Sequence, residues 1–117
     1  MFDRIVYIAG PYHSETQDGL EDNIDRARFA AEKLWEKGYS VICPHLNSAH
    51  MTGPREMYLA GDLAIISRLK PGQDSLYLLR NWIHSQGAKE ERSLAYQMGL
   101  VIWREGEAEP PDLMEVK

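Results

Sequence analysis

An acidic side chain interrupts the apolar face of a predicted helix at residues 87–98. At about 100° per residue, one stripe of this helix is formed by Ala88, Leu94, Ala95 and Met98. Glu91 falls in the middle of that stripe. Because burial of a carboxylate is costly unless it is paired or used, Glu91 is a candidate nucleophile or general base. The alternative is a carboxylate that stabilises the positive end of the helix dipole.

Carboxylate nucleophiles act on sugar rings in retaining glycosidases, where a second carboxyl group assists. Asp62 is the candidate for that second group because it interrupts an otherwise apolar stretch at residues 58–66. Its alternative is an ordinary exposed helix acid, which spacing alone favours. The four histidines have no metal-ligand spacing, since His45 and His50 stand five residues apart. We therefore expect no metal and no cofactor.

Composition restricts the possible partners. The chain has 117 residues, with 13 basic against 18 acidic side chains and a formal charge of −5. That balance argues against binding to a nucleic acid polymer or an anionic membrane. Cys43 is the one cysteine. From the composition of residues 1–5 and the lack of a long apolar run, we expect neither a signal peptide nor a membrane-spanning segment. We expect a single cytoplasmic domain over residues 1–117.

Short apolar runs alternate with helical patterns along the chain. The expected strands and helices are 5–9, 20–37, 39–43, 55–68, 75–79, 87–98 and 100–103. Trp35 and Trp103 fall in core patterns of these elements. Residues 104–117, rich in acids and prolines, form a peripheral tail that is either loose or ordered by a partner.

This alternation predicts an α/β fold: a mostly parallel sheet of four to five strands with helices on both faces, flavodoxin-like or Rossmann-like. Ligands of such sheets bind outside the carboxyl ends of the strands. Three segments meet there in the predicted order: residues 10–12, 45–47 and 80–87. The same crevice receives the start of the helix that carries Glu91.

Four segments of the chain resemble the nucleoside 2-deoxyribosyltransferase superfamily, and most closely its small DUF4406-type branch. They are Val6-Tyr7-Ile8-Ala9-Gly10-Pro11, Asp62-Leu63, Asp74-Ser75-Leu76-Tyr77-Leu78-Leu79 and Ser85-Gln86-Gly87-Ala88-Lys89-Glu90-Glu91. The resemblance extends from residue 4 to about residue 103. It implies a single α/β domain that processes nucleosides or nucleotides.

The resemblance also implies catalytic roles. Glu91 matches the glutamate that attacks the anomeric carbon of the sugar. Tyr7 matches a first-strand tyrosine that orients this glutamate, although a tyrosine packed in the core is the alternative. Asp62 matches an aspartate that contacts the base or helps to protonate it. The other residues expected to bind substrate are Gly10, Pro11, Tyr12, His45, Trp82, Ser85 and Gly87.

Two of these binding residues need comment. Trp82, in the loop before Ser85, is either a wall of the pocket or a subunit contact. Its loop reads Arg80-Asn81-Trp82 and lacks the Pro-Gly that the branch often has there, a departure that bears on the phosphate or base contacts of the loop. Ser85 stands where the superfamily's transferases on free nucleosides have an aspartate and its 5′-monophosphate hydrolases have a serine. A hydroxyl and helix N–H groups can donate to a phosphate that a carboxylate would repel. Nearby cationic candidates are His13, Arg80, His84 and Lys89, although for each of them taken singly a surface position is the favoured alternative.

The expected function is therefore N-glycosidic cleavage of a nucleoside 5′-monophosphate, with hydrolysis favoured over base exchange. Subunits of the superfamily often share their sites, which implies a homodimer or higher homo-oligomer. A non-catalytic nucleotide-binding protein that uses the same pocket is the alternative. A redox or signalling flavodoxin-like domain is disfavoured because no phosphate-binding glycine loop is present.

Overall fold

A four-stranded parallel sheet forms the centre of the molecule, in a computed structural model that describes residues 1–114. In the order β2-β1-β3-β4, the strands are Ser40–Ile42, Ile5–Ala9, Ser75–Leu78 and Val101–Arg104. All three strand pairings are parallel. β1 thus lies inside the sheet with a neighbour on each side. The predicted fold class is confirmed, with four strands.

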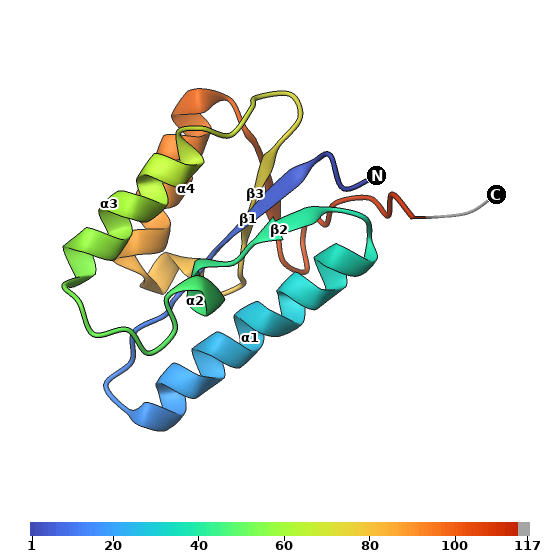
Figure 1. The fold of residues 1–117 in the computed structure, drawn as a ribbon. Helices are drawn as coiled ribbons and strands as arrows, with labels where there is room; N and C mark the ends of the chain where they lie inside the picture. The colour runs from blue at the N-terminus through green and yellow to red at the C-terminus, as the bar shows by residue number, and fades with distance from the viewer. Residues whose placement is uncertain (115–117) are drawn as a thin grey trace.

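Helices cover both faces of this sheet (Figure 1). α1 (Gln17–Glu36) packs on one face, while α3 (Arg55–Ile66) and α4 (Gln86–Met98) pack on the other. α1 begins three residues before the predicted start because Thr16 caps it, its hydroxyl accepting a hydrogen bond from the Gly19 N–H at 3.0 Å. Two short helices complete the chain: α2 (Pro44–Asn47) and the 3-10 helix η1 (Trp82–His84).

The two faces of β1 belong to two separate cores. Val6 and Ile8 pack with the α1 side, and Tyr7 and Ala9 pack with the side of α3 and α4. All four side chains are buried because β1 is covered on both faces. This alternation directs Tyr7 toward α4, the helix that carries Glu91.

One predicted core residue lies outside the core. Trp35 is 47% exposed, with its ring centroid 6.2 Å from that of Phe2. On α1 it falls at the margin of the buried stripe that Ala27, Ala31 and Leu34 occupy, near the end of the helix. The expectation that Trp35 packs in the core was wrong. Trp103 does pack against the α1-side core.

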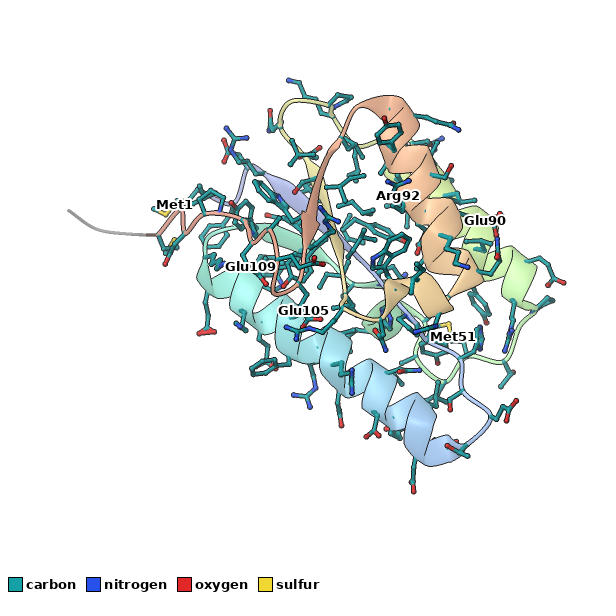
Figure 2. All side chains as sticks on the ribbon, turned by 180° about the vertical axis from the view of Figure 1, so that it is seen from behind. Met1, Met51, Glu90, Arg92, Glu105 and Glu109 are labelled. Atoms are coloured by element: carbon teal, nitrogen blue, oxygen red, sulfur yellow. The ribbon has the colours of Figure 1, made fainter. Side chains whose placement is uncertain are left out.

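The segment after β4 is held by the chain itself as far as residue 114 (Figure 2). The Tyr77 hydroxyl donates to the Glu109 carboxylate at 2.8 Å. Lys37 Nζ and the Tyr39 hydroxyl donate to the carbonyls of Pro110 and Pro111. Contacts within one chain therefore order residues 104–114, and residues 115–117 of the expected tail lie outside the described part.

No helix within residues 1–114 combines the length and the apolar character needed to cross a bilayer.

Candidate active site

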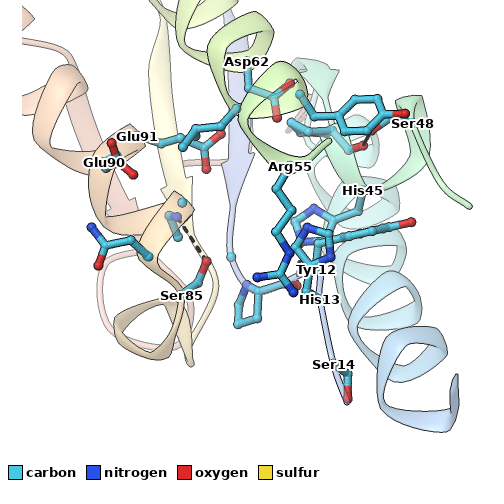
Figure 3. Close-up of a pocket in the computed structure, with 18 of the residues that line it drawn as sticks. Tyr12, His13, Ser14, His45, Ser48, Arg55, Asp62, Ser85, Glu90 and Glu91 are labelled. Carbon is cyan, nitrogen blue, oxygen red and sulfur yellow. Dashed lines mark hydrogen bonds between the residues drawn. The ribbon is translucent and has the colours of Figure 1, made fainter. Parts of the chain in front are cut away.

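A cavity of about 740 Å³ opens at the carboxyl ends of the strands (Figure 3). Its lining comes from the loop after β1, the region of α2, residues 55–62 of α3 and the start of α4. This is where ligands bind in open parallel sheets. Predicted site residues that line the cavity are Gly10, Pro11, Tyr12, His45, Asp62, Ser85, Gly87 and Glu91.

Glu91 lies at the end of this cavity between α4 and the sheet. Its side chain is 6% exposed and accepts a hydrogen bond from the Tyr7 hydroxyl. Burial raises the pKa of Glu91 to about 8; the Asp62 and Glu90 carboxylates add to the rise, and the Tyr7 hydrogen bond opposes it. Glu91 is thus a buried carboxyl group beside a cavity rather than a solvated acid at a helix end, which is typical of functional sites.

Tyr7 stands behind Glu91 rather than in the cavity wall. It is fully buried in β1, and burial together with the neighbouring Glu91 carboxylate raises the pKa of its hydroxyl far above the ordinary value. A hydroxyl that stays protonated donates to the ionised form of Glu91. Tyr7 therefore fixes the direction of the carboxylate, which is the geometry that the family resemblance implies.

Asp62 contributes a second carboxyl group from α3, on the cavity side of the helix. It is half-buried, and burial raises its pKa to about 6. The exposed-acid alternative for Asp62 does not hold. The cavity therefore contains two carboxyl groups with raised pKa values, and glycosidic cleavage uses a pair of carboxyl groups.

The start of α4 forms a further wall. Ser85 is its N-cap, with the hydroxyl oxygen accepting from the Ala88 N–H at 3.1 Å. The hydroxyl proton remains available to a ligand. At Gly87 a methyl group would meet Leu59 at 3.8 Å, which is ordinary contact, so size alone does not require glycine there.

The turn after β1 forms the opposite wall. At Gly10 a Cβ would come within 2.8 Å of the Leu79 Cβ, so only glycine allows this close approach. His45 is buried, and its Nε2 lies 2.9 Å from the Pro11 carbonyl. Burial lowers the pKa of His45, so a neutral ring donates from Nε2 and holds the Gly10-Pro11 turn.

Tyr12 extends this wall. Its ring lies edge-on to those of His13 and His45, with centroid separations of 5.1 and 6.1 Å. Its hydroxyl accepts from the His50 N–H at 2.7 Å. Tyr12 is thus a fixed flat surface beside the cavity, suited to a planar group.

One expected binding residue lies outside the cavity. Trp82 does not line the cavity; it packs against the core under α4, with the Arg92 guanidinium 5.9 Å from its ring centre (Figure 2 labels Arg92). Its place on η1 turns the indole toward that core. Among the cationic candidates, His13 and His84 line the cavity, but Arg80 and Lys89 do not.

Arg55 lines the cavity, although the sequence pattern does not single it out. It is the first residue of α3, and Figure 3 shows its side chain descending toward the level of Ser85 and His13. One signal is present in the sequence: a cation in the first turn opposes the helix dipole, so a structural role does not explain it. Because the residues before α3 follow no periodic pattern, the sequence does not predict where the Arg55 side chain points.

Within residues 1–114, no group of three or more His, Cys, Asp or Glu side chains is arranged to hold a metal ion. The described side chains offer the chemistry of the two carboxyl groups with raised pKa values, Glu91 and Asp62, of the Tyr7 hydroxyl and of several hydrogen-bond donors.

Comparisons with known proteins agree with this architecture. A solved structure of a 2-deoxyribosyltransferase from the psychrotolerant bacterium Bacillus psychrosaccharolyticus matches with a TM-score of 0.60 and 19% identity, over 86% of this chain and 70% of that one. A search of curated protein sequences gave no match. The profile of DUF4406, described as a domain of unknown function, matches residues 4–104. The fold is thus that of the deoxyribosyltransferase, and the chain belongs to the DUF4406 family.

Proposed function

We propose that this protein cleaves the bond between base and sugar of a nucleoside 5′-monophosphate, in its ribose or 2-deoxyribose form, with hydrolysis favoured over base exchange. The observation that carries the proposal is the buried Glu91 carboxylate, aimed by the Tyr7 hydroxyl at the end of the cavity. The structural neighbour, named as a 2-deoxyribosyltransferase, supports the same reaction class.

In the first step ionised Glu91 attacks C1′ of the sugar. The bond from C1′ to the Glu91 oxygen forms while the bond from C1′ to the base nitrogen breaks, and the electron pair leaves with the base. Asp62 supplies a proton to the departing base directly or through water, since its raised pKa of about 6 keeps a share of it protonated near neutral pH. Tyr7 holds the attacking oxygen in line.

In the second step water attacks C1′ and gives its proton to Asp62, and the Glu91 carboxylate leaves. The products are free base and sugar phosphate. A second base in place of water would make the protein a transferase. Both outcomes share one glycosyl-enzyme intermediate, so the competition between water and base decides between them.

The preference for a 5′-monophosphate is supported by the α4 N-terminus. Ser85 places a hydroxyl there without negative charge, and the first N–H groups of α4 face the same end of the cavity. A homodimer or higher homo-oligomer belongs to this proposal, because superfamily sites are often shared between subunits.

The alternative is a non-catalytic nucleotide-binding protein. Burial of Glu91 raises its pKa to about 8, which keeps most of it protonated at neutral pH. A protonated carboxyl group can donate to a ligand without attacking it. The raised pKa of Glu91 is therefore the observation that favours a nucleotide-binding protein without turnover.

A chromatographic assay for free base separates the two candidates. Wild type and Glu91→Gln are incubated with nucleosides and nucleoside 5′-monophosphates, in ribo and 2′-deoxy forms, and thermal stabilisation by each compound is measured in parallel. We expect base release by wild type and none by the variant. Stabilisation by nucleotides without any base release would overturn catalysis and leave the binding role.

A further inference from the structure

The cavity is acidic, which poses a problem for a phosphate. Five carboxylates line it: Glu15, Glu56, Asp62, Glu90 and Glu91. Of the described residues that line the cavity, Arg55 alone carries a permanent positive charge. Ser85 can orient a phosphate oxygen, but its neutral hydroxyl offsets none of this negative charge. A doubly charged phosphate therefore needs the guanidinium close by.

Arg55 has no protein partner for its guanidinium among the described residues, so this group is free to bind a ligand. It makes no hydrogen bond and no ion pair with any side chain in residues 1–114, although carboxylates line the same cavity. It stands in the first turn of α3, where a cation opposes the helix dipole. Its five N–H donors are thus left for a planar or tetrahedral anion.

His13 lies near Arg55, on the loop after β1. Burial, and then the Arg55 charge, lower the pKa of His13, so the two groups are close enough to repel each other. An anion between them would remove that repulsion and be held by both. Figure 3 shows the Arg55 guanidinium between the Ser85 side and the His13 side of the cavity.

We propose that Arg55, with His13 beside it, binds the phosphate of the substrate and sets the preference for nucleotides over nucleosides. This rests on the proposed function. The guanidinium fork donates two parallel hydrogen bonds to phosphate oxygens, and His13 contacts a third. Arg55 is a specificity-determining residue; the bond-breaking groups remain Glu91 and Asp62.

The test measures binding in a protein that cannot turn over. Each common 2′-deoxynucleoside 5′-monophosphate and its nucleoside are titrated calorimetrically into Glu91→Gln, alone and combined with Arg55→Gln or Arg55→Lys. Arg26→Gln, an exposed arginine of α1 outside the cavity, is the matched control. Thermal unfolding verifies that every variant is folded, which is expected because Arg55 is exposed.

We expect Arg55→Gln to weaken monophosphate binding by about 10- to 100-fold and nucleoside binding by less than about 2-fold. Arg55→Lys keeps the charge but loses the fork, so its loss is smaller. Equal losses for both ligands, or none for the monophosphate, would overturn the assignment. Because binding is measured without turnover, absence of base release in wild type would refute the glycosidase and leave this site intact.

Discussion

Two tyrosine–glutamate pairs lie on opposite faces of the same sheet. Tyr7 of β1 donates to Glu91 of α4, and Tyr77 of β3 donates to Glu109 in the segment after β4. The surroundings of the two carboxylates differ. Glu109 is exposed and also accepts from the Gly106 N–H at 2.7 Å. Glu91 is buried, and Tyr7 is its one hydrogen-bond donor within residues 1–114.

This difference separates a structural pair from a chemical one. Glu109 has solvent, a backbone N–H and the Lys37 ammonium 4.0 Å away to stabilise its charge. Glu91 has instead the Asp62 and Glu90 carboxylates nearby, which together with burial raise its pKa to about 8. The same two residue types thus fasten a segment in one place and hold a reactive group in the other.

The largest expected effect compares the two glutamates directly. Glu91→Gln removes the nucleophile, so base release falls by about 10³-fold or more. Glu109→Gln changes a contact on the other face of the sheet and leaves base release unchanged. Initial rates of base release from the best substrate measure both variants. Equal losses in the two variants would remove the distinction between the pairs.

The next effect compares the tyrosines. Tyr7→Phe leaves Glu91 without its hydrogen-bond donor, so we expect kcat to fall by about 10- to 100-fold. Tyr77→Phe leaves kcat unchanged. Circular dichroism establishes that both variants are folded before their rates are compared.

The pH profile sharpens this second comparison. With Asp62 protonated and Glu91 ionised in the active form, wild-type kcat/KM is highest between the two pKa values, about 6 and about 8. Loss of the Tyr7 hydrogen bond raises the pKa of Glu91 further, so in Tyr7→Phe the upper limb moves to higher pH and the plateau falls. An unmoved upper limb would contradict the role of Tyr7.

A smaller effect concerns stability and pH. The folded-state pKa of Glu91, about 8, lies above its ordinary value of 4.5. Its contribution to stability is therefore present in full below pH 4.5 and is lost as the pH rises through 8. We expect Glu91→Gln to raise the free energy of unfolding relative to wild type by on the order of 2 kcal/mol at pH 9, and by little at pH 5. Urea unfolding at both pH values measures the difference.

The smallest effect is the loss of the second pair. Tyr77→Phe removes the hydroxyl that holds Glu109, and we expect the free energy of unfolding to fall by about 1 kcal/mol. Amide hydrogen exchange in residues 104–114 is expected to accelerate while that of β1 does not. Exchange that accelerates in β1 instead would show that this pair supports the sheet rather than the segment.

Periodic elements are the part of the fold that the sequence predicts well. The apolar run at residues 5–9 and the helical pattern at 87–98 agree with β1 and α4 to within a residue or two, and the apolar stripe alone singles out Glu91. A carboxylate in an otherwise apolar helix stripe breaks the hydrophobic pattern, and such breaks are typical of functional sites. The oriented Tyr7 hydroxyl follows from the family resemblance rather than from the pattern.

Irregular segments are the part that the sequence does not predict. Arg55 enters the cavity only because the loop before α3 turns it inward, and no periodicity describes that loop. Trp82 is expected at the cavity because its loop lies there, whereas the single turn of η1 rotates it toward the core. Trp35 stands at the margin of its stripe near the end of α1, where its ring lies close to that of Phe2 and remains 47% exposed.

The central place of β1 has a consequence for how the site responds to warming. A strand paired on both sides and covered on both faces opens only with the whole sheet, so the Tyr7 hydroxyl stays aligned until global unfolding. The first turn of α3 has no side-chain cap, and such ends fray at low energetic cost. As temperature rises, contacts made by Arg55 therefore loosen before those made by Tyr7. Affinity for the phosphate of a ligand therefore declines with temperature, while Tyr7 and Glu91 keep their geometry at the sugar.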